Sequence, residues 1–395
     1  MHAPRGVRRS RLVITVVVVV VVAAGAAVLA TIAQRDGPSH RPSHGKEGAA
    51  TTTTTPTTTT PTTTTPTTTT PTTTTPTTTT PTTTTPSTTT PTTTQPRVGG
   101  IGTYRVATTS LTVLVPGLSS TDDELPTTVW YPVVGSPAAH AGARRFPLLV
   151  FSEGFAVPVS SYATLITDWA SAGFVVAGPT YPHTSPSTPT TLDRADLVHH
   201  PVDLAAVITT VVDAAQERGS VLSGLIDTSA VGLVGQSDGG DVSLALVDNS
   251  CCKVAGVKAA AILSGAEYAG FGGRYFPPGT PAPPPLLVVQ GTSDTVNPPA
   301  CSAQLYDAAS PPKFYLDLSG ATHLGPYTEP SVWEPVVAAV TTEFFDAELS
   351  GTPGALVQMA KSGDVPGLAE LTSTPATPQL SGSCPTAPVP VQAAA

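Results

Sequence analysis

A serine inside a glycine-flanked turn is the most reactive feature of the sequence. Gly235-Gln236-Ser237-Asp238-Gly239 matches the pattern G-x-S-x-G and stands between an apolar run, AVGLVG, and a helix-like run, DVSLALV. A strand, a sharp turn and a helix in this order form a nucleophile elbow, in which small residues let the backbone turn tightly beneath an exposed hydroxyl. The pattern therefore predicts Ser237 as the nucleophile of an acyl-transfer reaction.

A serine hydroxyl needs a general base, which is most often histidine. The chain has eight histidines, and only His323 follows Ser237. Where a nucleophile elbow carries the serine, the chain order is serine, acid, histidine. We therefore predict His323, in the segment GATH after a β-rich run, as the base.

The acid that orients the histidine should follow a buried strand, because loops at the carboxyl ends of parallel strands build active sites. Asp294, in the segment GTSD, comes directly after the apolar run PLLVVQ and is the preferred candidate. Glu267, which follows the preceding apolar run, is the alternative. Asp307 and Asp317 fall within a predicted helix and a predicted strand, so both are weaker candidates.

A tetrahedral intermediate requires two backbone N–H donors for its oxyanion. We predict the N–H of Asp238, directly after the nucleophile, and the N–H of Phe155, in the loop SEGF that follows the apolar run FPLLVFS. Side chains beside the serine, in the oxyanion loop and after core strands are candidates for substrate binding, namely Gln236, Glu153, Tyr268 and Trp333. No Cys/His spacing resembles a metal site.

The elements that must position these residues alternate between strand and helix patterns. Strands are expected at 103–115, 127–134, 146–152, 174–178, 230–235, 257–263, 286–290 and 313–318, the first two as an antiparallel pair. Helices are expected at 163–172, 201–217, from Ser237 to about 247, and at 332–349. This alternation predicts a mostly parallel central sheet covered by helices on both faces. Together with the nucleophile elbow and the order serine, acid, histidine, it is the pattern of the α/β-hydrolase fold. Two short helices are expected later, at 355–360 and 365–371.

The motifs GQSDGG, GTSD and GATH and the loop FSEGF resemble those of actinobacterial α/β-hydrolases. They are similar to the branch with dienelactone-hydrolase-like, chlorophyllase-like and platelet-activating-factor-acetylhydrolase-like enzymes, and to the related cutinase-like polyester hydrolases. The resemblance covers about residues 102–349 and implies carboxylic-ester hydrolysis through an acyl-enzyme, without a cofactor. Gln236 and Glu153 depart from the family pattern, which commonly has His, Tyr or Trp at the first position and His at the second.

The chain before the predicted catalytic domain has two parts. Residues 1–35 carry four arginines ahead of an apolar run of about 22 residues, which is long enough for a hydrocarbon core of ~30 Å. We expect a membrane anchor here rather than a cleaved signal peptide, with the rest of the chain outside the cytoplasm, or secreted if cleavage occurs. Residues 36–100 are a predicted disordered Thr/Pro-rich stalk, because the tract offers no apolar residues to bury.

Two further segments complete the predicted organisation, a catalytic domain at 101–350 and a tail at 351–395. The net charge is −9, and no Lys/Arg cluster lies beyond the N-terminus, so no nucleic-acid partner is expected. An exported chain can form disulfides. Cys301 with Cys384 is the favoured pair, whereas Cys251 and Cys252 are open between a vicinal bridge, other pairings and reduced thiols.

Taken together, these patterns predict an esterase or lipase-like serine hydrolase that acts on a small-molecule, lipid or polymeric ester. A cell-envelope acyltransferase would use the same residues, and the sequence does not separate water from an alcohol as the acyl acceptor. A non-catalytic surface module on a stalk is the third possibility. The complete set of Ser237, Asp294 and His323 argues against this last possibility.

Overall fold

The computed structural model describes residues 92–94, 102–115, 124–134, 145–279, 283–375 and 384. The predicted membrane segment at 1–35, most of the predicted stalk and the end of the predicted tail lie outside these residues. Within the predicted stalk, Thr92–Thr94 form strand β1, which pairs with β2 in antiparallel orientation.

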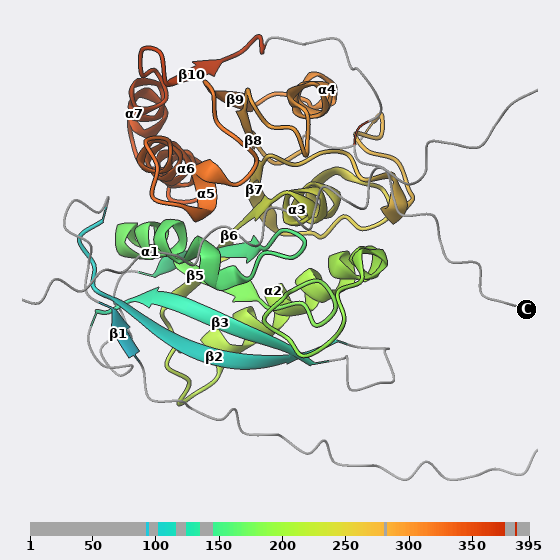
Figure 1. Cartoon of the computed structure of the whole chain (residues 1–395). Coiled ribbons are helices and arrows are strands. Elements are labelled where there is room, and N and C mark those ends of the chain that lie inside the picture. Colours follow the sequence, from blue (N-terminus) through green and yellow to red (C-terminus); the bar gives the residue numbers. More distant parts are fainter. Residues whose placement is uncertain are drawn as a thin grey trace, which may run out of the picture. The chain divides into compact units, whose positions relative to one another are not determined.

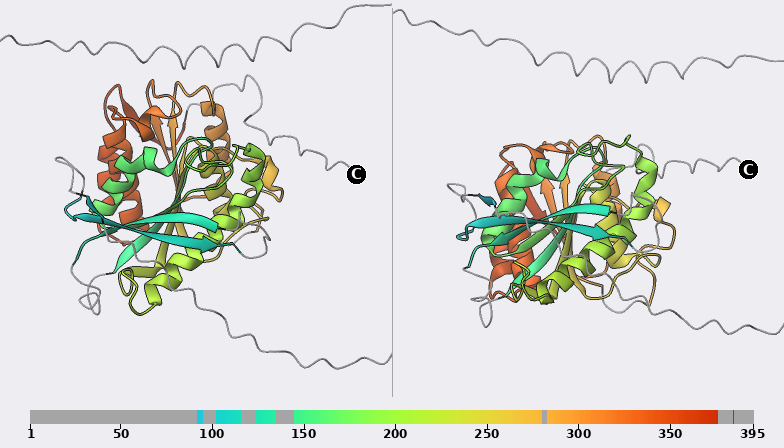
Figure 2. Two further views of the ribbon diagram at one scale, coloured as in Figure 1. Left: turned by 60° about the horizontal axis from the view of Figure 1, so that its bottom comes forward. Right: turned by 90° about the horizontal axis from the view of Figure 1, so that it is seen from below.

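One mixed sheet organises the described residues. Its ten strands follow the order β1-β2-β3-β5-β4-β6-β7-β8-β9-β10. The pairs from β5 through β4, β6, β7 and β8 to β9 are parallel, and the outer pairs are antiparallel. The remaining bounds are β2 Val106–Leu114, β3 Glu124–Pro132, β4 Phe146–Ser152, β5 Val175–Pro179, β6 Ile226–Gln236, β7 Val257–Leu263, β8 Leu286–Gly291, β9 Lys313–Leu318 and β10 Ala369–Thr372. Figure 2 shows the long β2–β3 pair crossing in front of the rest of the sheet.

Helices cover both faces of this sheet. In Figure 1, α1, α6 and α7 lie to the left of the strands, and α2, α3 and α4 lie to the right. The helices are α1 Ala163–Ala172, α2 His200–Gln216, α3 Asp238–Asp248, α4 Pro299–Ala308, α5 Gly325–Thr328, α6 Glu334–Glu348 and α7 Ala355–Ser362. Short 3-10 helices are η3 Val159–Tyr162, η4 Arg194–His199 and η5 Ala269–Phe271. This arrangement is the predicted α/β-hydrolase fold.

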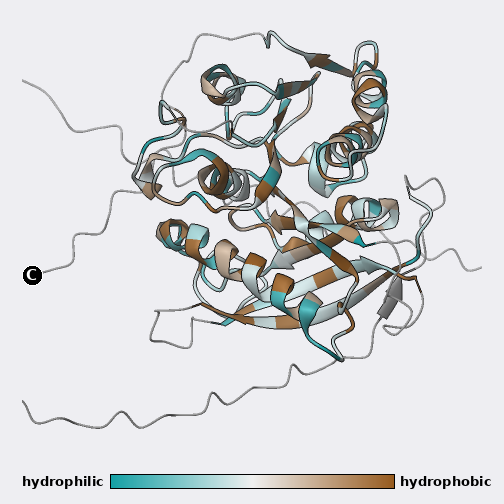
Figure 3. Cartoon of the chain, turned by 180° about the vertical axis from the view of Figure 1, so that it is seen from behind, coloured by the Kyte–Doolittle hydropathy of each residue, from teal (hydrophilic) through white to brown (hydrophobic). Residues whose placement is uncertain are grey.

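Strand β4 is an example of a central strand that is buried on both faces of the sheet. All seven of its residues are buried. Leu148 and Val150 join the cluster under α2, whereas Leu149 and Phe151 join the cluster under α1 and α6. Successive side chains of a strand point to opposite faces, so an unbroken apolar run fits two helix layers. In Figure 3 hydrophobic residues appear as brown segments along the strands and as brown bands on the helices.

One helical segment of the described residues, Arg194–Gln216, is long and apolar enough to cross a membrane by length and composition. It consists of η4 and α2. Helix α2 buries Leu204, Val207 and Val211 against the sheet, as a core helix does. Its apolar character is therefore accounted for by packing within the domain.

The predicted helix at 365–371 is wrong. Its second half is strand β10, which pairs antiparallel with β9, so the sheet continues past the predicted domain boundary at 350. Gly367 has φ +73°, a conformation that glycine adopts readily, and the chain turns there to pair Val365 with Ala369. A short apolar run does not distinguish helix from strand by its period alone.

Candidate active site

The nucleophile elbow forms where β6 ends at Gln236 and α3 begins at Asp238. Ser237 lies between them with φ 55° and ψ −125°, a strained conformation for a residue with a side chain. A Cβ at Gly235 would collide with the backbone of Gly239, and a Cβ at Gly239 would collide with the backbone of Ser152. The glycines therefore permit the close approach of α3 to β4 and β6 on which the elbow depends.

The predicted nucleophile, base and acid are hydrogen-bonded in a row. His323 Nε2 lies 2.9 Å from Ser237 Oγ, and His323 Nδ1 lies 2.8 Å from Asp294 Oδ2. The His323 side chain is 11% exposed and that of Asp294 is fully buried. With the Nδ1 proton donated to the carboxylate, Nε2 is left to accept the serine proton, which is the arrangement needed for general-base catalysis. The contact to His323 is made by Asp294, the preferred acid, and not by Glu267.

Asp294 is held by several donors besides His323. Its Oδ1 accepts hydrogen bonds from the backbone N–H groups of Val296 and Asn297, each at 2.9 Å. Its Oδ2 accepts a further bond from Gln290 Nε2 at 3.1 Å. Hydrogen bonds from several donors fix the orientation of a carboxylate. Asp294 is thus prepared to stabilise a cationic His323.

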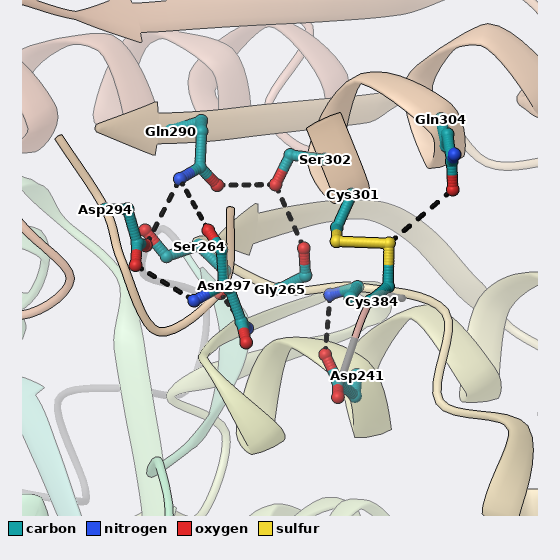
Figure 4. Close-up of a disulfide and its surroundings, with 11 residues drawn as sticks. Asp241, Ser264, Gly265, Gln290, Asp294, Asn297, Cys301, Ser302, Gln304 and Cys384 are labelled. Carbon is teal, nitrogen blue, oxygen red and sulfur yellow. Dashed lines mark hydrogen bonds between the residues drawn. A yellow bond between two sulfur atoms is a disulfide. The ribbon is translucent and has the colours of Figure 1, made fainter. Parts of the chain in front are cut away.

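Gln290 connects this acid to helix α4 (Figure 4). Its Oε1 accepts a hydrogen bond of 2.5 Å from the hydroxyl of Ser302, which also donates to the carbonyl of Gly265. Ser302 is the neighbour of Cys301, which forms a disulfide with Cys384. The favoured cysteine pair is therefore present, and Cys251 and Cys252 form the vicinal bridge.

The two predicted oxyanion donors lie beside the serine. Phe155 and Asp238 both line the same cavity as Ser237. The N–H groups on either side of Phe155 are engaged, since Gly154 N–H donates to the Tyr162 hydroxyl and Ala156 N–H donates to the Thr184 carbonyl. Neither the Phe155 N–H nor the Asp238 N–H has an acceptor among the described residues. Both donors are therefore available to a ligand.

A cavity of about 420 Å³ opens at Ser237 and His323. Its apolar wall consists of Phe155, Val157, Val296 and Leu324, and Gln236, Asp238, Asn297 and Arg194 complete the lining. A volume of this order suits a small-molecule site, for which ~300–1,000 Å³ is typical. The aliphatic part of this wall was not predicted from the sequence, because it comes from three separate loops with no shared motif.

Arg194 is a further cavity residue that was not predicted from the sequence. Its Nε and Nη2 donate to Asp238 Oδ2 and Oδ1 at 2.7 and 2.6 Å, and its guanidinium lies 5.6 Å from the Tyr268 ring centroid. The hydrogen bonds to Asp238 raise the pKa of Arg194 and keep it charged. No motif surrounds Arg194, and its contact depends on a loop path that the sequence does not specify.

Of the four predicted substrate-binding side chains, only Gln236 reaches the cavity lining. Tyr268 packs beneath Arg194, and the Trp333 indole N–H donates to the carbonyl of Ser319. Glu153 points into the protein, where its Oε1 accepts from the Tyr181 N–H at 3.4 Å. Burial raises the pKa of Glu153 to about 8, so this carboxyl is mainly neutral at pH 7. The expectation that Glu153 faces the substrate is not met.

Within the described ranges, no group of three His, Cys, Asp or Glu side chains could hold a metal ion. The residues that line the cavity offer donors and apolar surface, with Asp238 already paired to Arg194. The groups at the site that can take part in acyl transfer are the Ser237 hydroxyl, the His323 imidazole and the backbone N–H groups of Phe155 and Asp238.

Part of the domain is similar to a known family of ester hydrolases. The fold is that of the α/β-hydrolases. Residues 123–217 match the family model of platelet-activating factor acetylhydrolase, isoform II. The matched segment runs from β3 to the end of α2 and includes Phe155 and Arg194, whereas Ser237 lies beyond it. No curated protein matches the chain. The family match supports ester hydrolysis as the general activity.

Proposed function

We propose that the protein is a serine ester hydrolase that cleaves carboxylic esters through an acyl-enzyme. The observation that carries the proposal is the row of hydrogen bonds from Ser237 through His323 to Asp294 at the mouth of a partly apolar cavity. The match to an acetylhydrolase family supports it, since an acetylhydrolase acts on an acetyl ester.

In the first half-reaction, Ser237 Oγ attacks the ester carbonyl carbon while His323 Nε2 takes the hydroxyl proton. The carbonyl π electrons move to oxygen, and the N–H groups of Asp238 and Phe155 donate to this oxyanion. The intermediate then collapses, the C–O bond to the alcohol breaks, and His323 returns the proton to the leaving oxygen. The products of this half are the free alcohol and an acyl ester on Ser237.

In the second half-reaction, His323 takes a proton from water, and the resulting hydroxide oxygen attacks the acyl carbon. Collapse of this intermediate breaks the bond to Ser237 Oγ, which recovers its proton from His323. Asp294 stays ionised throughout and stabilises the imidazolium in both halves. The acid product leaves, and Ser237 is regenerated.

The first test uses p-nitrophenyl esters of increasing acyl length with the wild type and a Ser237→Ala variant. Removing the nucleophile should lower kcat by about 10⁴-fold or more. Ser171→Ala is the matched control, because it also removes a buried serine hydroxyl, in this case one that donates to the Asp168 carbonyl on α1. Equal activity of the wild type and Ser237→Ala would overturn the proposal.

The same assay separates water from an alcohol as acyl acceptor. The acyltransferase alternative would be favoured by a single burst of one p-nitrophenol per protein molecule with no further turnover in water. Added alcohol should then restore steady turnover. A folded wild type that neither turns over nor reacts with a fluorophosphonate at Ser237 would favour the non-catalytic surface module. Steady turnover in water is the expected result.

We also propose that the domain works outside the cytoplasm, held by the predicted membrane segment at 1–35. Two disulfides among the described residues support this location, because such bonds persist in oxidising compartments. Protease added to intact cells should remove the activity from the membrane fraction. Activity that stays protected until the cells are lysed would contradict the proposal.

A further inference from the structure

A chain of buried hydrogen bonds runs behind Ser237 and links the oxyanion loop to the loop of the base. It begins at Gly154, the neighbour of the predicted oxyanion donor Phe155. The Gly154 N–H donates to the Tyr162 hydroxyl at 3.3 Å, and the Tyr162 hydroxyl donates to Gln236 Oε1 at 2.8 Å. Tyr162 is fully buried at the start of α1.

This series of hydrogen bonds ends at His323, the predicted base. Gln236 Nε2 donates to the backbone carbonyl of His323 at 3.1 Å and lies 3.3 Å from His323 Nε2. The same His323 Nε2 lies 2.9 Å from Ser237 Oγ. One amide nitrogen therefore touches both the main chain of the base loop and the ring atom that receives the serine proton.

The direction of the Gln236 amide is set by this chain. Because the Tyr162 oxygen accepts from the Gly154 N–H, its proton is free to donate to an acceptor, which must be Gln236 Oε1. The amide nitrogen is then turned toward His323. Burial raises the pKa of Tyr162, so its hydroxyl keeps this proton over the working pH range. A Cβ at Gly154 would lie only 2.6 Å from Gln236 Oε1, so glycine permits the close approach.

We infer that Tyr162 and Gln236 are positioning residues that fix the oxyanion loop and the base loop in one catalytic geometry. This inference rests on the proposed function. Gln236 was expected to bind substrate and borders the cavity, but its exposed fraction is 0%. Its polar atoms are instead committed to Tyr162 and His323.

The test compares the steady-state constants of Tyr162→Phe and Gln236→Met with those of the wild type. Each change removes hydrogen bonds and keeps the approximate volume, so kcat should fall about 10- to 100-fold while KM changes by less than about 3-fold. Both changes interrupt the same series of hydrogen bonds. The kcat of the double variant should therefore be close to that of the slower single variant.

Tyr306→Phe is the matched control. Tyr306 is also a buried tyrosine, and its hydroxyl donates to the Ser373 carbonyl at 3.3 Å, away from this chain. Its kcat should stay within about 2-fold of the wild type. Circular dichroism and thermal unfolding check that every variant is folded, so a loss of kcat in a folded variant reports on positioning.

Gln236→Glu tests positioning through the pH dependence of kcat, which should not change if Gln236 only contributes to stability. An ionised carboxylate cannot donate to the His323 carbonyl, whereas a protonated one can. The ratio of kcat for this variant to kcat for the wild type should therefore rise as the pH falls from 8 to 5. A pH-independent ratio, or Gln236 variants that raise KM and keep kcat, would overturn the inference. If Ser237→Ala is as active as the wild type, the proposed function fails instead.

Discussion

At the scale of single residues, the carboxylate oxygens at the site all have hydrogen-bond partners within the protein. Asp294 accepts from His323, Gln290 and two backbone N–H groups. The Asp238 carboxylate is occupied on both oxygens by Arg194. The Ser237 hydroxyl, which is bonded to His323, and the N–H groups of Phe155 and Asp238 are then the groups at the cavity that can act on a ligand. Catalysis benefits from donors that are fixed before the substrate arrives.

Glu153 gives a residue-scale prediction about pH. Burial raises its pKa to about 8 in the folded protein, above its ordinary value of 4.5. The folded state then holds a proton that the unfolded state loses, so Glu153 makes the protein less stable as the pH rises from about 4.5 to about 8. Replacing Glu153 with Gln should stabilise the protein relative to the wild type by about 2–4 kcal/mol at pH 8.5, and by much less at pH 4.5.

Urea unfolding of the wild type and Glu153→Gln at both pH values measures this difference. Asp203 is the matched control, because burial also raises its pKa, to about 7, away from the oxyanion loop. Asp203→Asn should show the same sign of change, with most of the gain complete by pH 7. A stability difference between wild type and Glu153→Gln that does not vary with pH would show that the carboxyl is not held neutral by burial.

At the scale of elements, the approach of α3 to β4 controls the elbow. Gly239 lies in the first turn of α3, and a Cβ there would collide with the backbone of Ser152 at the end of β4. Backbone cannot move aside as a flexible side chain can, so Gly239→Ala should shift α3 and displace Ser237. We expect a loss of about 2–4 kcal/mol of stability and at least about 100-fold in kcat.

Gly351→Ala is the comparison for this change. Gly351 has φ +62°, and no atom lies within 4 Å of a Cβ built there, so its alanine variant should lose about 1 kcal/mol and keep full activity. Thermal unfolding and ester hydrolysis of both variants measure the difference. A fully active Gly239→Ala enzyme would show that the elbow tolerates a wider approach.

The elements that sequence reasoning predicted well are those with strong local patterns. The bounds of β4, β7, β9 and α1 agree with the predicted ranges, because short runs rich in apolar residues and one amphipathic stretch define them. Strand β10 was predicted as helix, because its identity depends on pairing with β9, a contact across some fifty residues. Arg194 and the Tyr162–Gln236 contact were missed for the same reason, since they depend on where distant loops meet.

At the scale of the whole molecule, the two disulfides differ in what they constrain. Cys301 and Cys384 are separated by 83 residues, whereas Cys251 and Cys252 are adjacent. A crosslink lowers the entropy of the unfolded chain more when it closes a longer loop, although strain and residual structure modify the effect. Cys301–Cys384 also joins residue 384 to α4, which reaches Asp294 through Ser302 and Gln290 (Figure 4).

Replacing Cys301 and Cys384 together with Ser should therefore lower the free energy of unfolding by about 2–4 kcal/mol. The matched variant, Cys251→Ser with Cys252→Ser, opens a loop of adjacent residues and should lose much less by loop entropy. Guanidinium unfolding of both variants, with and without a reductant, measures the two effects separately. A reductant should destabilise the Cys251/Cys252 variant, which keeps the long crosslink, and leave the Cys301/Cys384 variant nearly unchanged. Equal losses in the two variants would mean that local packing around each pair, rather than the length of chain enclosed, sets the contribution of the disulfide.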